Sequence, residues 1–190
     1  MYVKSICVDM GVPVLSSSLE IGSFFVTPVS MGNPHAVCFV PNSPSEYPVE
    51  KWGPFLECHP QLGERSNVEF VQIVSHNKIC LRIWERGSKE TLSCGTGACA
   101  AAVCAIQQKG MENKVLAEVP GGTLTISWNG NGEAVFLSGP AEFICDACFN
   151  SLTNKYLQHL KVNGFRKIPG AYYSRLTPIH SKPHVSVRRC

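Results

Sequence analysis

The sequence contains no apolar run of about 18 residues and no charged-then-apolar leader followed by a cleavage site. These absences argue against a membrane-spanning helix and against secretion, so we expect a cytoplasmic protein without a membrane partner. Charged residues are also few, at 16%, while 44% of the 190 residues are hydrophobic. This composition is typical of a globular protein with one good core or two small ones, and it excludes fibrous and disordered classes.

A second C-x-x-C pair, which a typical structural zinc site would need, is missing, although the chain has ten cysteines. The single pair, Cys145 and Cys148, is a weak indication of metal or redox chemistry. Half of the cysteines lie in apolar or alanine-rich segments, where a thiol behaves as a small hydrophobic group: Cys7, Cys38, Cys80, Cys99 and Cys104. We therefore predict mostly reduced thiols and no metal site.

The last 46 residues have almost no acidic side chains. Residues 145–190 hold eight Lys or Arg and one acid, Asp146, whereas residues 1–144 hold nine basic and thirteen acidic residues. The later segment is also rich in turn-forming residues. We predict a folded domain over 1–144 and a basic, partly disordered extension over 145–190. Such an arm could bind nucleic acid or anionic lipid, but a solvated extension explains the same pattern, and we expect no nucleic-acid partner.

Short runs of β-branched and aromatic residues dominate residues 1–144. They predict strands over 3–8, 24–29, 35–40, 68–74, 79–84, 115–119, 124–128 and 134–137. A short helix is predicted over 47–58. A longer helix is predicted over 96–109, ending at Gly110, because glycine commonly follows the last helical turn.

The helix over 96–109 is apolar on every side and carries no charge before Lys109. A helix that is apolar all round is buried, so the strands must wrap around it. Its N-terminus then collects unpaired backbone N–H groups and the positive end of the dipole beside Cys94, Gly95 and Thr96. Such an end holds an anion and lowers the pKa of a thiol.

Four motifs resemble the C-terminal half of the diaminopimelate epimerase family, in that family's order. They are "MGNPHAV" (31–37), "SNVEFVQI" (66–73), "WERGSKETLSCGTGACAAAV" (84–103) and "SGPAEFI" (138–144). The resemblance covers nearly all of residues 1–144. It implies an α+β domain in which a mixed, barrel-like sheet wraps around a central apolar helix, with the substrate lying between two such halves.

The resemblance also implies an isomerase that interconverts LL- and meso-diaminopimelate, in lysine and peptidoglycan precursor synthesis, without pyridoxal phosphate, metal or another cofactor. Inverting an unactivated α-carbon needs a base on each face, one removing a proton while the other returns one. The family uses two cysteines for this task. Cys94 matches the cysteine of the C-terminal half.

Further roles follow from the same motifs. His35 and Glu85 resemble groups beside the reacting centre, and the residues that resemble substrate contacts are Asn33, Asn67, Glu85, Arg86, Gly95 and Thr96. Arg86 would offer a bidentate fork to a carboxylate. Simpler explanations stay open: Cys94 as an inert helix cap, Glu85 and Arg86 as a surface ion pair, His35 as a core histidine, and Asn33 as a turn former before proline.

The sequence departs from the family pattern in three ways. Nothing in it resembles the glycine-rich C-G-N-G loop that carries the partner cysteine in the family's first half. Lys89 occupies a position that is usually glycine, and a positive φ there would strain lysine by about 1 kcal/mol. The basic extension is the third departure. We therefore expect a partner: a separate N-terminal half or a second copy of the chain.

Two other functions remain open on the sequence alone. The chain could be a non-catalytic remnant or amino-acid-binding module that keeps the carboxylate pocket. It could also be a proline-racemase-like isomerase of the same fold, although the glutamate–arginine pair at 85–86 suits a substrate with a second amino-acid group.

Overall fold

The computed structural model describes residues 5–141 of the chain. The predicted extension over 145–190, with Cys145 and Cys148, lies outside these described residues. Within them, no helix is both long and apolar enough to cross a membrane.

An eleven-stranded mixed sheet is the main structural element of the described chain. Its order is β1 (Ile6–Asp9), β11 (Phe136–Gly139), β10 (Gly122–Ser127), β9 (Lys114–Val119), β7 (Lys78–Glu85), β6 (Asn67–Ser75), β5 (Pro34–Phe39), β4 (Phe24–Ser30) and β2 (Val14–Leu15). Off this path, β3 (Leu19–Ile21) pairs with β4, and β8 (Lys89–Thr91) pairs with β7. The β5–β6 and β7–β9 pairs are parallel and the others antiparallel.

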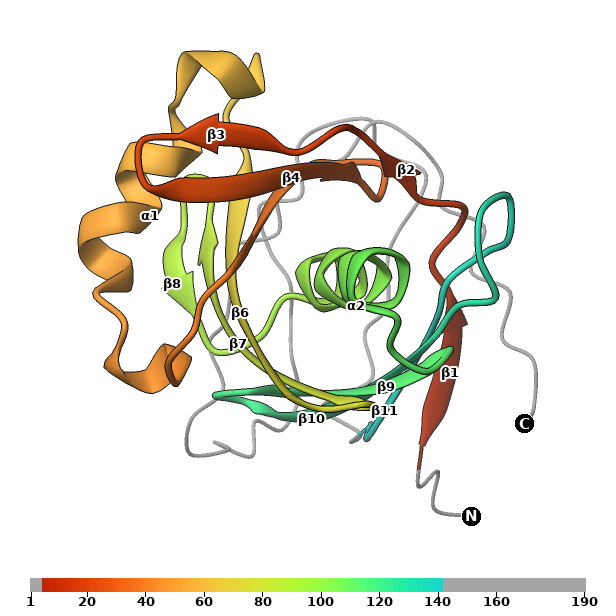
Figure 1. Cartoon of the computed structure of the whole chain (residues 1–190). Coiled ribbons are helices and arrows are strands. Elements are labelled where there is room, and N and C mark those ends of the chain that lie inside the picture. The colour runs from red at the N-terminus through yellow and green to blue at the C-terminus, as the bar shows by residue number, and fades with distance from the viewer. Residues whose placement is uncertain (1–4, 142–190) are drawn as a thin grey trace, which may run out of the picture.

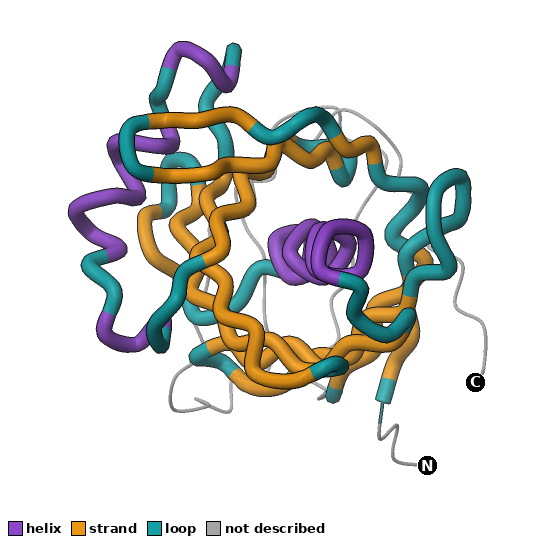
Figure 2. The backbone as a smooth tube through the Cα atoms, viewed as in Figure 1, coloured by secondary structure: helices purple, strands orange, loops and turns teal. Residues whose placement is uncertain are grey.

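The sheet curls around helix α2 (Gly95–Lys109), which Figure 1 shows end-on at the centre of the strands. Figure 2 shows the same arrangement, with the central helix surrounded by strands on most sides. The end strands of the order, β1 and β2, do not pair with each other, so the sheet is open. The structure therefore confirms the predicted α+β class and the central helix.

The two faces of the sheet bury different cores. The inner face packs on α2, whose residues from Gly97 to Ala105 are all buried, and the small side chains of the helix allow the strands to lie close. Helix α1 (Val49–Glu57) packs against β6, β7 and β8, over a second core that includes Phe24, Phe70 and Trp84. Short 3-10 turns, η1 (Pro44–Glu46) and η2 (Pro60–Leu62), flank α1.

The strands and helices predicted from the sequence are present, with bounds that differ by a few residues at each end. Three strands were missed: β2, β3 and β8. Each has two or three residues, which is too short for an alternating pattern to show.

Candidate functional site

Cys94 is the N-cap residue of α2, with an extended backbone and its carbonyl oxygen accepting the Ala98 N–H at 2.9 Å. Its Sγ lies 3.5 Å from Oγ1 of Thr96. A Cβ added to Gly97 would lie only 3.4 Å from this sulfur, so glycine leaves room for the thiol beside the first turn. The predicted position of the thiol, at the N-terminus of a buried helix, is confirmed.

The ionisation state of Cys94 differs from our expectation. Burial raises the pKa of the thiol to about 11, and the charge of Glu85 adds to that rise. The Thr96 hydroxyl and the Gly97 N–H lower the pKa, but they do not outweigh burial. The helix dipole alone would lower the pKa of the thiol, but the desolvation of the sulfur is the larger effect here. At neutral pH the thiol is therefore protonated in the free chain.

Asn33 and His35 lie at the turn from β4 into β5, where Gly32 has a φ of 90°. The Asn33 Nδ2 group donates to Oγ1 of Thr96 at 3.4 Å, and His35 Nε2 lies 3.1 Å from Asn33 Oδ1. His35 is 1% exposed. The structure thus brings together four residues that the sequence placed in the site: Asn33, His35, Cys94 and Thr96.

Glu69 belongs to the same cluster, although the sequence argument did not single it out. Its Oε1 lies 2.7 Å from Nδ1 of His35, and the side chain is 0% exposed. Among the described residues, none is a hydrogen-bond partner of Oε2. A Cβ on Gly97 would lie 2.7 Å from Oε1, so Gly97 makes room for this carboxyl group as well as for the thiol. The available signal was a glutamate between apolar residues of β6, with Val68 before it and Phe70 after it.

Glu85, Arg86 and Asn67 are arranged around the hairpin from β7 to β8. Glu85 Oε1 accepts the Thr91 hydroxyl at 2.5 Å, and Asn67 Oδ1 accepts the backbone N–H of Arg86 at 2.9 Å. The Arg86 guanidinium donates to the Arg65 carbonyl at 3.3 Å and is 41% exposed. Its charge thus faces the rim of the site rather than a buried partner.

Lys89 has a φ of 67° and is the one non-glycine residue of the described chain with a positive φ. It begins β8, directly opposite Glu85 in the strand register. The left-handed backbone that we anticipated at this position is therefore present. Lysine is tolerated there at a cost of about 1 kcal/mol relative to a residue with relaxed geometry.

Glu57, at the end of α1, holds the same hairpin in place through hydrogen bonds. It was not predicted from the sequence. Its Oε2 accepts the Trp84 indole N–H at 2.7 Å, while Oε1 accepts the Gly87 N–H at 3.2 Å and pairs with Arg65. Three donors converge on one carboxylate that is 4% exposed. These hydrogen bonds depend on tertiary packing, so no local sequence pattern predicts them.

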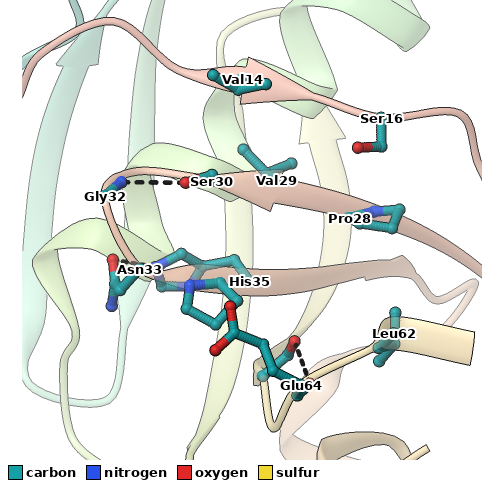
Figure 3. Close-up of a pocket in the computed structure, with 12 residues that line it drawn as sticks. Val14, Ser16, Pro28, Val29, Ser30, Gly32, Asn33, His35, Leu62 and Glu64 are labelled. Atoms are coloured by element: carbon teal, nitrogen blue, oxygen red, sulfur yellow. Dashed lines mark hydrogen bonds between the residues drawn. The ribbon is translucent and has the colours of Figure 1, made fainter. Parts of the chain in front are cut away.

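A pocket with a volume of about 190 Å³ has Asn33 and His35 in its lining (Figure 3). Strands β2 and β4, the 32–35 turn and the segment after η2 line it, with Ser16, Ser30, Glu64 and Ser66 as polar groups. The pocket is about the size of a few waters or one end of an amino acid. Asn33 and His35 therefore contact both the pocket and the thiol network.

Comparison with known proteins finds similar sequences in one family. A sequence model of the family described as "Diaminopimelate epimerase" matches residues 27–144. A diaminopimelate epimerase of Azotobacter vinelandii is 45% identical over 152 residues, which cover 72% of this chain and 55% of that protein. A diaminopimelate epimerase of Stutzerimonas stutzeri is 50% identical over 129 residues, 67% of this chain and 46% of the relative. The chain spans about half the length of the curated relatives it matches.

A solved structure of a hydroxyproline epimerase from Agrobacterium vitis superposes with a TM-score of 0.54 and 14% identity, over 72% of this chain and 50% of that one. At this identity the likeness concerns the fold alone.

Proposed function

The chain belongs to the diaminopimelate epimerase family, and from this premise we propose that it carries one half of an epimerase site for LL- and meso-diaminopimelate. The supporting observation is the placement of Cys94. A thiol at the N-terminus of a buried helix, with a hydroxyl and an amide beside it, is suited to exchanging a proton with a bound amino acid.

Cys94 would act as the proton donor in the resting state. Its thiol is protonated at neutral pH, because burial raises its pKa to about 11. A thiolate on the opposite face would take the α-proton, the electrons of the broken C–H bond would pass to the α-carbon and its carboxylate, and Cys94 would deliver its proton to the other face. After one turnover the two sulfurs have exchanged roles, which suits a reversible reaction.

The start of α2 would hold the substrate's α-carboxylate. The first backbone N–H groups of a helix have no intrahelical partner, and here they belong to Gly95, Thr96 and Gly97. The positive end of the helix dipole favours the charge that develops as the α-proton leaves. Asn33, Asn67, Glu85 and Arg86 would contact the distal amino-acid end. Arg86 would exchange an exposed 3.7 Å ion pair with Glu64, which contributes little, for the substrate carboxylate.

The second thiol would come from another polypeptide segment, either a separate N-terminal half or a second copy of this chain. Nothing in the sequence resembles the C-G-N-G loop of the family's first half. With one thiol, the chain would exchange the α-proton of the isomer whose C–H bond faces Cys94, without inverting it.

Incubating LL- and meso-diaminopimelate with the chain in deuterated buffer tests this proposal. We expect deuterium at one α-carbon, at a rate that increases with pH toward 11, since the base is the Cys94 thiolate. The exchange should disappear in Cys94→Ala and persist in Cys58→Ala, which removes an exposed thiol elsewhere. Saturable binding without exchange would favour an amino-acid-binding module. If the chain shows no binding and no exchange, the proposal is overturned.

A further inference from the structure

The buried carboxyl group of Glu69 has no part in the proposed function, and its environment favours the neutral acid. One oxygen contacts His35 Nδ1 and the other has no partner. An ionised carboxylate with a bare oxygen in a core is strongly disfavoured, and a neutral acid much less so. Burial is the largest influence on the pKa of Glu69 and raises it. The charge and hydrogen bond of His35 and the Ala36 backbone lower the pKa without outweighing burial, and the charge of Glu85 adds the smallest rise.

If Glu69 is neutral, its proton decides which group is the donor in each hydrogen bond between Glu69 and Cys94. Its O–H donates to Nδ1 of His35, so a neutral imidazole carries its hydrogen on Nε2. Nε2–H donates to Asn33 Oδ1, which directs the Asn33 amide nitrogen at Oγ1 of Thr96. Thr96 accepts that hydrogen, so its own hydroxyl is free to donate to Cys94 Sγ at 3.5 Å. Every donor in this series of hydrogen bonds then points toward the Cys94 sulfur.

We propose that Glu69 is a positioning residue whose proton sets the direction of this hydrogen-bond chain, through His35, Asn33 and Thr96, to the Cys94 sulfur. Loss of that proton reverses the chain. The carboxylate accepts from Nδ1–H, Nε2 becomes an acceptor, and the Asn33 amide turns to offer its nitrogen. Asn33 Oδ1 then accepts the Thr96 hydroxyl, and the thiolate of Cys94 loses the donor that stabilises it.

The groups around Glu69 agree with a neutral acid. The titratable side chains close enough to interact with its charge are His35 and Cys38 from β5, Glu85 from β7, and Cys94 and Cys104 from α2. Among these, only His35 can carry a positive charge. Gly97 contributes the space, because a Cβ there would collide with Oε1.

This inference rests on the proposed function, since the chain of bonds ends at the proposed catalytic thiol, but it can be tested without turnover. The nitrogen chemical shifts of the His35 ring, assigned with His35→Asn, report which nitrogen carries the hydrogen. We expect Nε2–H at neutral pH and a change to Nδ1–H when Glu69 ionises at higher pH. Glu69→Gln should show no alkaline change from Nε2–H, because its amide has no proton to lose in this range and its N–H group can keep donating to Nδ1.

An Nδ1–H or doubly protonated His35 in the wild type at neutral pH would overturn the inference, as would an alkaline change that persists in Glu69→Gln. If that variant does not fold, the wild-type titration alone decides. Correct ring states without any diaminopimelate exchange would leave this inference standing and count against the proposed function.

The thiol supplies a second measurement. Alkylation of Cys94, measured by mass spectrometry relative to exposed Cys58, should be faster in Glu69→Gln than in the wild type at alkaline pH, by roughly tenfold for one unit of thiol pKa. Glu69→Met, which removes both charge and donor, should give a rate below that of Glu69→Gln. Equal alkylation rates in the two variants would show that only the charge of Glu69 affects the thiol. That result would overturn the proposal that the direction of the hydrogen bonds matters.

Discussion

Within residues 5–141, one glutamate is buried on each side of the sheet, and the two differ in how many hydrogen bonds they receive. Glu57, between the outer face and α1, receives hydrogen bonds from Arg65, Trp84 and Gly87. Glu69, between the inner face and α2, has one side-chain partner, His35, and its Oε2 has no hydrogen-bond partner within residues 5–141. A saturated carboxylate stabilises a fixed geometry, whereas an undersaturated one keeps its proton and stays sensitive to pH. Burial alone therefore does not tell a structural acid from a functional one.

Replacing the saturated glutamate should have the largest effect on stability. Glu57→Ala leaves the Trp84 indole and the Gly87 N–H without partners, at a cost of about 2–4 kcal/mol. Urea denaturation followed by Trp fluorescence measures it. Glu57→Gln retains one acceptor oxygen and should lose less. A cost for Glu57→Ala within about 0.5 kcal/mol, typical of surface sites, would remove the distinction between the two glutamates.

Filling the space beside Glu69 should have the next largest effect. Gly97→Ala would ordinarily favour a helix, but its Cβ would lie 2.7 Å from Glu69 Oε1, so we expect a loss of about 1–3 kcal/mol. Gln107→Ala, on the exposed part of the same helix, serves as the control and should change little. Thermal unfolding compares the two. A stabilised Gly97→Ala variant would mean that Glu69 can move away at no cost.

The pH dependence of stability should differ between wild type and Glu69→Gln. The folded-state pKa of Glu69 is raised, so as pH increases above about 4.5 the unfolded chain ionises first and the stability of the wild type falls until the folded-state pKa is passed. The loss is about 1.4 kcal/mol for each unit by which the pKa is raised. Glu69→Gln lacks this loss. Denaturation midpoints at several pH values measure the difference, and parallel curves would contradict it.

The smallest expected effect lies at the hairpin that Glu57 supports. Lys89→Gly should relieve the left-handed strain and stabilise the chain by up to about 1 kcal/mol, partly offset by the greater freedom of glycine when unfolded. Lys89→Ala keeps the strained φ and serves as the matched control. An equal gain in both variants would assign the effect to the charge of lysine instead.

The sequence predicted what depends on local pattern: the buried helix, the longer strands and the thiol at the N-terminus of α2. The resemblance to the family pointed to the left-handed position at Lys89. The sequence did not predict what depends on tertiary contact. Glu57 and Glu69 meet partners that are 8 to 34 residues away in the chain, and no spacing rule links them. The pKa of Cys94 was misjudged because desolvation is a property of the packed core, whereas the helix dipole can be read from the helix alone.

The pairing of β1 with β11 also bears on how the domain can be carried by a longer protein. Ile6 and Gly139 are direct partners across these strands, so the two ends of the described fold meet at one point. A host polypeptide could hold this domain as an insertion without being stretched, and a linker of a few residues could join the two ends in a circular permutant. Either arrangement leaves the N-terminus of α2, with its thiol, unchanged. In the insertion, the domain would be connected to its host at one place only.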